Sequence, residues 1–216
     1  MRDFARRLLF VLVLLPVAAC SAENNTAPAD NFKPGDHYKV MPRQIESTSG
    51  GDQIEVLEFF LYTCPHCYAF EPTVSKWSKA PPEGVTFKQV PAAFGAHTVP
   101  MSKAFYTAEA LGVLDKLHPA LFDAIHKHKL KLDTEEAIAA IFLQNGVSES
   151  DFKNTFNGFH VANLVLRADQ LTQAYKVTGV PSMAVAGKYW INPNMGRGYD
   201  GMINVVNALI AREQAK

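Results

Sequence analysis

The sequence predicts an α/β fold into which an all-helical domain is inserted. A strand–helix–strand pattern occupies residues 53–91, roughly sixty residues with only helical periodicity follow it, and a helix, two short strands and a last helix complete the chain. A length of 216 residues suits one domain with an insertion. The composition, with 48% hydrophobic and 19% charged residues, is typical of a globular protein with a core.

Residues 1–19 have the pattern of a signal peptide. Basic side chains at positions 2, 6 and 7 precede an apolar run over 8–17, which is about half as long as a membrane-spanning helix. The segment 17–20, Val-Ala-Ala-Cys, resembles a bacterial lipobox, in which Cys20 carries the lipid of the mature protein. In the alternative, the signal is cleaved after the small residues and Cys20 remains an ordinary thiol. We favour the lipid, because a spare thiol is a liability in an oxidising compartment.

Residues 20–36 are polar and rich in Ala, Asn, Pro and Asp, so we expect a flexible tether there.

The whole chain has 21 Lys and Arg against 21 Asp and Glu. A net charge of zero argues against a general nucleic-acid-binding protein. Three cysteines are too few for a disulfide-rich scaffold, which indicates local, reactive cysteine chemistry.

The first strand is expected at 53–61, where QIEVLEFFL is almost continuously apolar. Pro65 suits the first turn of the helix that follows, because its missing N–H is not needed there. Helical spacing of apolar residues supports this helix: Phe70, Val74 and Trp77. Pro72 is expected to kink it. Residues 84–91 alternate apolar and polar side chains as a second strand does, so the three elements form a βαβ unit.

The next segment has helical periodicity throughout. We expect breaks at His118-Pro119, Asp133-Thr134 and Gly146, which leave helices at 101–117, 120–128, 134–145 and 148–156. A long helix over 162–178 then leads to two short strands, 182–186 and 188–191, joined at Gly187 as a hairpin, and to a last helix at 202–212.

This order of elements describes a thioredoxin-like fold with an inserted all-helical domain. We expect the thioredoxin-like domain to comprise residues 37–97 and 162–216. The inserted helical domain is then 98–161.

The segment Cys64-Pro65-His66-Cys67 lies where the first strand gives way to a helix. The thiolate is the nucleophile in thiol–disulfide exchange, and a helix N-terminus favours it through free N–H groups and the positive end of the dipole. Cys64 is expected at the tip, and Cys67 one turn further in, where it can resolve a mixed disulfide. A protonated or donating His66 would further stabilise the Cys64 thiolate. The pattern therefore predicts redox activity.

Two structural alternatives to redox activity are weaker. A passive Cys64–Cys67 bridge would close a very short loop and stabilise the fold by only about 2 kcal/mol. A zinc site would combine the cysteines with two of three histidines, but the spacing is loose and the chain has no second CxxC. Those histidines are His118, His126 and His128. Residues 126–129 are better explained as a solvated helix end, and we expect neither a metal nor another cofactor.

Glu58 places a carboxyl inside the apolar strand, which is unfavourable unless the group has a partner or a task. It could pass protons to and from Cys67, with burial raising its pKa toward the working range. The alternative is ordinary strand alternation, with Glu58 turned toward a polar gap. We favour the proton-transfer role, and we expect Glu55 to face solvent.

Val180-Pro181 precedes a strand that could lie beside the CxxC turn. A cis bond there would present the Val180 backbone to a substrate strand, but only about 5 to 6% of X-Pro bonds are cis, so the sequence does not establish it.

The glycines at 196, 198 and 201 match G-x-G-x-x-G. Too few residues follow for a dinucleotide-binding unit, so we expect a loop.

Three stretches resemble the DsbA family of thiol:disulfide oxidoreductases: VLEFFLYTCPHCYAFEP (56–72), ALGVLDKLHPALFDAIH (110–126) and TGVPSMAVAGKYWINPN (178–194). The resemblance implies a thioredoxin fold with an inserted helical domain. It also implies a role for each residue of the site: a surface-exposed nucleophile at Cys64, a buried resolving Cys67, thiolate support from His66, and a cis Pro181.

The resemblance further implies an enzyme that donates its disulfide to newly exported, cysteine-containing proteins. We expect this enzyme to be a monomer. A membrane quinone reductase of the DsbB type would re-oxidise it. We expect a periplasmic protein that is lipid-anchored at Cys20, unlike the best-known members, which are soluble. Substrate contacts are expected at Pro65, Val180 and Pro181.

Two other functions remain open. A disulfide isomerase or reductase of the same fold would differ in whether the cysteine pair is kept oxidised in the cell. A peptide-binding chaperone would keep its function when Cys64 is replaced by Ser.

Overall fold

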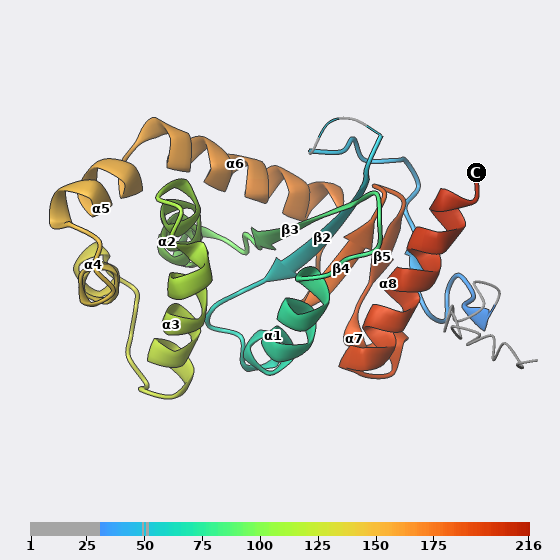
Figure 1. The fold of residues 1–216 in the computed structure, drawn as a ribbon, viewed down its shortest axis with the longest axis horizontal. Coiled ribbons are helices and arrows are strands. Elements are labelled where there is room, and N and C mark those ends of the chain that lie inside the picture. The colour runs from blue at the N-terminus through green and yellow to red at the C-terminus, as the bar shows by residue number, and fades with distance from the viewer. Residues whose placement is uncertain (1–30, 49, 51) are drawn as a thin grey trace, which may run out of the picture.

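The computed structural model describes residues 31–48, 50 and 52–216 (Figure 1). The expected signal peptide, Cys20 and most of the expected tether lie outside the described residues. The end of that tether is described, and there Phe32 is half-buried and meets the His37 ring edge-on, with ring centroids 5.3 Å apart. None of the helices in the described ranges has the length and apolar character needed to cross a membrane.

A five-stranded mixed sheet, in the order β1-β5-β4-β2-β3, forms the centre of the fold. Its strands are β1 (Lys39–Val40), β2 (Ile54–Phe60), β3 (Val85–Pro91), β4 (Ser182–Val185) and β5 (Tyr189–Ile191). β2 and β3 are parallel and the remaining pairs are antiparallel, which confirms the βαβ unit and the hairpin. Positive φ angles at Ala186 (54°) and Gly187 (69°) form the hairpin turn.

The helices surround this sheet. Their bounds are α1 (Pro65–Ser78), α2 (Val99–Ala110), α3 (Leu114–His126), α4 (Glu135–Gln144), α5 (Glu149–Phe156), α6 (Phe159–Ala174), α7 (Pro193–Gly196) and α8 (Tyr199–Gln214), with a short 3-10 helix, η2 (Ala96–Thr98), before α2. Figure 1 shows α2 to α5 grouped beyond the β3 edge, with α6 leading back to the sheet. Pro72 lies inside α1 without ending it.

The expected break at His118-Pro119 is wrong. α3 runs through both residues, and the break falls instead at Gly112, whose φ is +67°. Gly112 ends α2 as a Schellman cap: Val113 N–H bonds to the Ala108 carbonyl and Gly112 N–H to the Glu109 carbonyl. The glycine is the stronger signal because it supplies this left-handed conformation, while burial of the apolar face of α3 tolerates Pro119.

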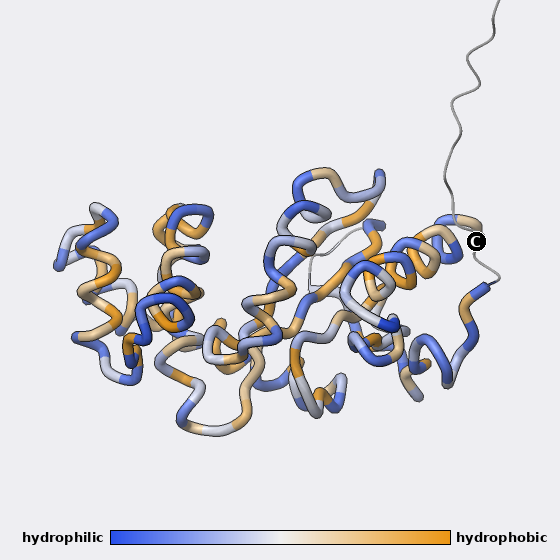
Figure 2. The backbone as a smooth tube through the Cα atoms, turned by 90° about the horizontal axis from the view of Figure 1, so that it is seen from below, coloured by the Kyte–Doolittle hydropathy of each residue, from blue (hydrophilic) through white to orange (hydrophobic). Residues whose placement is uncertain are grey.

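Apolar side chains pack on both faces of the sheet. On one face, Val56 of β2 belongs to a core with Phe70 of α1 and Leu209 of α8. On the other face, Leu57 and Phe59 join a core that continues into the helical segment. The helices carry hydrophobic and hydrophilic stretches in alternation, as amphipathic helices do (Figure 2).

The glycine motif near the C-terminus is not a loop. Gly196 is the last residue of α7, and Gly201 lies in the first turn of α8. A Cβ at Gly196 would lie 2.4 Å from Met202 N, and a Cβ at Gly201 would lie 1.8 Å from the Gly196 carbonyl oxygen. These glycines therefore allow the two helices to pack backbone against backbone.

Candidate active site

The cysteine pair lies at the start of α1. β2 ends at Phe60, three residues connect it to the helix, and Cys64 is the N-cap residue with Pro65 directly after it. Cys64 is half-buried, whereas Cys67, one turn further along, is only 1% exposed. The two cysteines are not joined by a disulfide in the structure. An attacking thiol can therefore reach Cys64 more readily than Cys67.

The two sulfurs have opposite proton affinities. The pKa of Cys64 is lowered to about 5, chiefly by a hydrogen bond from the Cys67 thiol and further by backbone N–H groups and the charge of His66, against the opposing effect of partial burial. The pKa of Cys67 is raised, first by burial and then by its hydrogen bond to Cys64. At neutral pH Cys64 is thus a thiolate and Cys67 a thiol.

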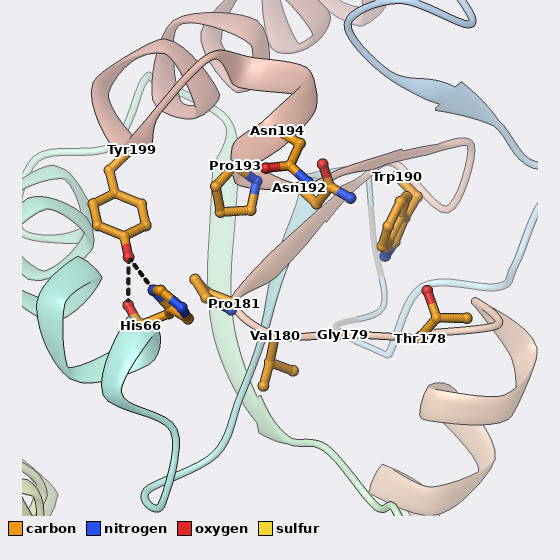
Figure 3. A pocket seen from close by; sticks show the side chains of 10 residues that line it. All are labelled: His66, Thr178, Gly179, Val180, Pro181, Trp190, Asn192, Pro193, Asn194 and Tyr199. Atoms are coloured by element: carbon orange, nitrogen blue, oxygen red, sulfur yellow. Dashed lines mark hydrogen bonds between the residues drawn. The ribbon is translucent and has the colours of Figure 1, made fainter.

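His66 is exposed beside this pair, and Tyr199 at the start of α8 contacts it. Tyr199 Oη donates a hydrogen bond to the His66 carbonyl oxygen over 3.0 Å and lies 3.5 Å from His66 Nδ1 (Figure 3). The pKa of Tyr199 is raised by burial and by the charges of the two cysteines, so its hydroxyl keeps its proton. Nothing in the sequence pattern singled out Tyr199, because α8 begins far from the CxxC motif.

The loop before β4 faces the cysteines from the other side. The Val180-Pro181 bond is cis, and Cys64 Sγ lies 3.5 Å from the Val180 carbonyl oxygen. A cavity of about 380 Å³ begins here and extends away from Cys64. Its lining comprises His66, Thr178, Gly179, Val180, Pro181, Trp190, Asn192, Pro193, Asn194 and Tyr199 (Figure 3).

A match to a known family covers the chain from the residue after α1 to a point within α8. The family model of the DSBA-like thioredoxin domain matches residues 79–209. The thiol:disulfide interchange protein DsbA of Bordetella parapertussis is 40% identical over 203 residues, which are 93% of this chain and 96% of the relative. The chain belongs to the DsbA-like thioredoxin family.

Solved DsbA structures share the whole fold. DsbA of Pseudomonas aeruginosa superposes with a TM-score of 0.83 at 38% identity, over 88% of this chain and 98% of that one. DsbA of Xylella fastidiosa gives a TM-score of 0.79 at 30% identity, over 85% and 98%. The expected thioredoxin fold with a helical insertion is confirmed, and this DsbA-like chain is a protein thiol:disulfide oxidoreductase.

Glu58 lies beneath α1 in this DsbA-like fold. Its side chain is 1% exposed, and burial together with the charge of Glu71 raises its pKa to about 8, although a hydrogen bond from Gln89 opposes the shift. The charge of Glu58 in turn helps to raise the pKa of Cys67. The two groups are therefore electrostatically coupled.

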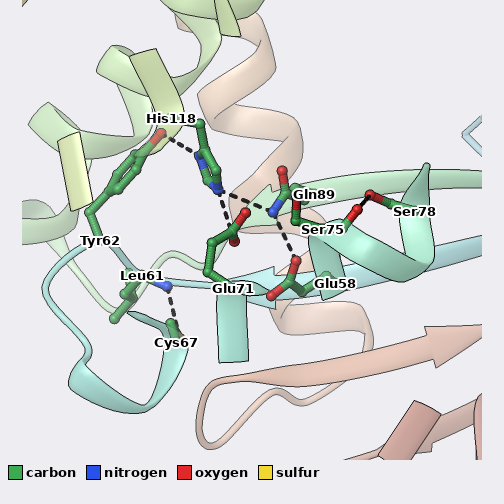
Figure 4. Close-up of polar contacts among 9 residues, drawn as sticks. All are labelled: Glu58, Leu61, Tyr62, Cys67, Glu71, Ser75, Ser78, Gln89 and His118. Carbon is green, nitrogen blue, oxygen red and sulfur yellow. Dashed lines mark hydrogen bonds and ion pairs between the residues drawn. The ribbon is translucent and has the colours of Figure 1, made fainter. Parts of the chain in front are cut away.

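A buried polar network connects Glu58 to the helical segment (Figure 4). Gln89 Nε2 lies 2.9 Å from Glu58 Oε2 and 3.2 Å from His118 Nε2. His118 Nε2 also lies 3.2 Å from Glu71 Oε2, and its Nδ1 lies 2.7 Å from Tyr62 Oη. Sequence reasoning considered His118 only as a zinc ligand and missed the other members, because they are adjacent only in the folded chain.

The expectation that Glu55 faces solvent is wrong. Glu55 is 3% exposed, and its carboxylate accepts a hydrogen bond of 2.9 Å from the Thr48 N–H. Both faces of β2 are covered in this structure, so strand alternation does not expose either glutamate.

The interpretation of residues 126–129 as a solvated helix end is correct only in part. His126 is half-buried, stacks on Tyr68 with ring centroids 4.7 Å apart, and lies with Nε2 2.8 Å from the Tyr62 carbonyl oxygen. Residues 127–129 are exposed. Within the described ranges, no group of three or more His, Cys, Asp or Glu side chains is arranged to hold a metal ion.

Proposed function

We propose that this chain introduces disulfide bonds into exported proteins in the bacterial periplasm. One observation carries the proposal: Cys64 has a pKa lowered to about 5, whereas the pKa of the buried Cys67 is raised. A stabilised thiolate at Cys64 makes the dithiol form favourable and the Cys64–Cys67 disulfide a strong oxidant.

Disulfide transfer then takes two exchange steps. A substrate thiolate attacks Cys64 Sγ, the bond to Cys67 breaks, and Cys67 leaves with the electron pair and takes up a proton. A second substrate thiolate attacks the substrate sulfur of this mixed disulfide and releases Cys64 as a thiolate. The substrate dithiol is oxidised to a disulfide, and the Cys64–Cys67 disulfide is reduced to a Cys64 thiolate and a Cys67 thiol.

The surrounding residues receive roles that fit these steps. Protonated Glu58 supplies the proton that Cys67 takes up, since both groups are buried and electrostatically coupled. His66 supports the Cys64 thiolate through its charge. The backbone at Val180 and the rings of Pro65 and Pro181 contact the substrate next to its reacting cysteine.

The cellular setting is part of the proposal. Residues 1–19 form the signal peptide, Cys20 carries the lipid that anchors the chain, and 20–36 form the tether. A membrane quinone reductase of the DsbB type re-oxidises the cysteine pair, and the enzyme acts as a monomer. Residues 37–97 and 162–216 form the thioredoxin-like domain and 98–161 the inserted helical domain.

An equilibrium titration against reduced and oxidised glutathione tests the oxidase function. We expect the chain to be substantially more oxidising than thioredoxin, whose potential is about −270 mV. A potential near that value would favour the reductase alternative. Cys64→Ser separates the oxidase from the chaperone. This variant should lose dithiol oxidation, whereas a chaperone would still suppress aggregation when Cys64 is replaced.

The lipid anchor has a separate test. Cys20→Ala is expected to move the mature protein from the membrane fraction to the soluble periplasmic fraction without changing its glutathione equilibrium. Metabolic labelling with a fatty acid that disappears in the same variant supports lipid attachment at Cys20. Unlabelled protein in the soluble fraction of the unaltered strain would contradict it.

A further inference from the structure

Trp190 buries a hydrogen-bond donor without a partner next to the active site. The residue lies in β5 and is 4% exposed, and its Nε1 has no hydrogen-bond partner. Within the described ranges, two other buried side-chain atoms share this property, the hydroxyls of Thr107 and Ser182, and neither residue lines the cavity beside Cys64. A buried donor left unpaired costs about 1 to 3 kcal/mol, so the site calls for an explanation.

The indole is held in place by the sheet. Trp190 pairs with Ala184 of β4 on one side and Lys39 of β1 on the other, and Lys39 Nζ lies 4.9 Å from the ring centroid. Figure 3 shows the nitrogen on the ring edge that is directed toward Thr178 and Gly179, two residues of the cavity lining. The other tryptophan differs, because Trp77 Nε1 donates to Asn207 Oδ1 over 2.8 Å.

The cavity lining contains hydrogen-bond donors but no Asp, Glu, Lys or Arg side chain. Asn192 Oδ1 already accepts a hydrogen bond of 3.0 Å from Met195 N–H at the start of α7, so the Asn192 NH₂ group is the part left for other contacts. An indole N–H and an amide NH₂ both require an oxygen acceptor. The volume of about 380 Å³ far exceeds the roughly 30 Å³ of one water and accommodates a side chain.

We propose that Trp190 is a specificity-determining residue, whose indole N–H receives the oxygen of a carboxamide or carboxylate side chain flanking the reacting cysteine of the substrate. The cavity runs from Pro181 and His66, which adjoin Cys64, to Trp190. A peptide linked to Cys64 therefore has a neighbouring residue within reach of it. This inference rests on the proposed transfer of a disulfide to protein substrates, and it adds which substrate sequences are preferred.

Trapped mixed disulfides measure the preference. In a Cys67→Ala background of the full chain, single-cysteine peptides displace glutathione from Cys64, and the equilibrium constant reports the non-covalent contacts of each peptide. Gln is compared with Met, which is of similar length but has no oxygen, at each of the three positions on either side of the cysteine. At one position we expect Gln to be favoured about 5- to 30-fold, the range of a buried hydrogen bond.

Trp190→Phe removes the donor and keeps an aromatic ring, and Trp77→Phe is the matched control. We expect the Gln preference to fall below about two-fold in Trp190→Phe and to persist in Trp77→Phe, given the size of the bond removed. In Trp77→Phe the single remaining indole N–H resonance should move downfield when the Gln peptide is attached, and less with the Met peptide.

Three results would overturn the inference: no position with a Gln preference, a preference that survives in Trp190→Phe, or an equal loss for all peptides in that variant. A second assay distinguishes failure of this inference from failure of the proposed function. It measures the oxidation of dithiothreitol by the chain with its Cys64–Cys67 disulfide intact. The wild-type chain should oxidise this small dithiol whatever the peptides show, since dithiothreitol has no flanking residue. A wild-type chain that cannot oxidise it would instead refute the oxidase function.

Discussion

The Glu58 carboxylate and the Gln89 amide lie side by side on neighbouring strands, with Gln89 Nε2 donating to Glu58 Oε2 over 2.9 Å. The two residues oppose each other in the β2–β3 register, so both side chains leave the sheet on the same face. The bond favours the charged carboxylate, but burial of Glu58 outweighs it and the pKa rises to about 8. Glu58 is therefore mostly protonated at neutral pH.

This titration predicts a pH-dependent difference in stability between the wild type and Glu58→Gln. The carboxyl ionises near 4.5 when unfolded and near 8 when folded. The contribution of this Glu58 shift to the free energy of unfolding is fully present below pH 4.5 and is lost as the pH rises toward 8. Above pH 8 no further stability is lost. At about 1.4 kcal/mol per pKa unit, the loss amounts to several kcal/mol at most.

Urea unfolding of the disulfide forms, in half-unit pH steps across this range, measures the difference. The wild type should lose stability relative to Glu58→Gln over the stated interval. Glu83→Gln, which changes an exposed carboxyl, is the control and should run parallel to the wild type. Parallel profiles for Glu58→Gln as well would show that burial does not shift the Glu58 titration.

The thiol of Cys67 should set the reactivity of Cys64. Because the hydrogen bond from Cys67 is the largest cause of the lowered Cys64 pKa, Cys67→Ala should raise the midpoint of Cys64 alkylation above about 5. Cys67→Ser keeps a donor at that position and should raise it less. Iodoacetamide labelling against pH measures all three proteins, and a wild-type midpoint near the 8.5 of free cysteine would contradict the assignment.

The local signals of the sequence were sufficient to place the cysteine pair. A continuous apolar strand, Pro65 and the helical spacing after it put Cys64 at a helix N-terminus, as the structure has it. The hairpin at Gly187 was equally readable, since its turn needs a positive φ. Each of these features depends on neighbours in the chain.

The rest of the site depends on contacts between distant segments. Tyr199 meets His66 across 133 positions, and Gln89 meets His118 across 29. Glu55 was misjudged for the same reason, because whether a strand face is covered depends on which elements pack there. The partnerless indole of Trp190 could not be found at all from sequence, since only the fold shows which donors lack partners.

Removing the Tyr199 hydroxyl should make Cys64 a weaker acid. Tyr199 Oη donates to the His66 carbonyl oxygen and faces Nδ1, so it holds an imidazole whose charge lowers the Cys64 pKa. Tyr199→Phe should therefore raise the alkylation midpoint slightly and shift the glutathione equilibrium about two- to five-fold toward the disulfide, the effect of one partly exposed hydrogen bond. In a His66→Ala background the same change should have no such effect, and an equal shift in both backgrounds would exclude His66 as the intermediary.

Adding a methyl group at Gly201 should destabilise the fold, although Gly to Ala inside a helix is usually stabilising by about 0.5 to 1 kcal/mol. The new Cβ would lie 1.8 Å from the Gly196 carbonyl oxygen, so α7 and α8 would have to separate. Overpacking of this kind typically costs about 1 to 3 kcal/mol. Gly179→Ala is the matched control, because its Cβ meets nothing within 4 Å. Urea unfolding should show a lower free energy of unfolding for Gly201→Ala alone. A Gly201→Ala variant as stable as the wild type would mean that the two helices do not approach each other so closely.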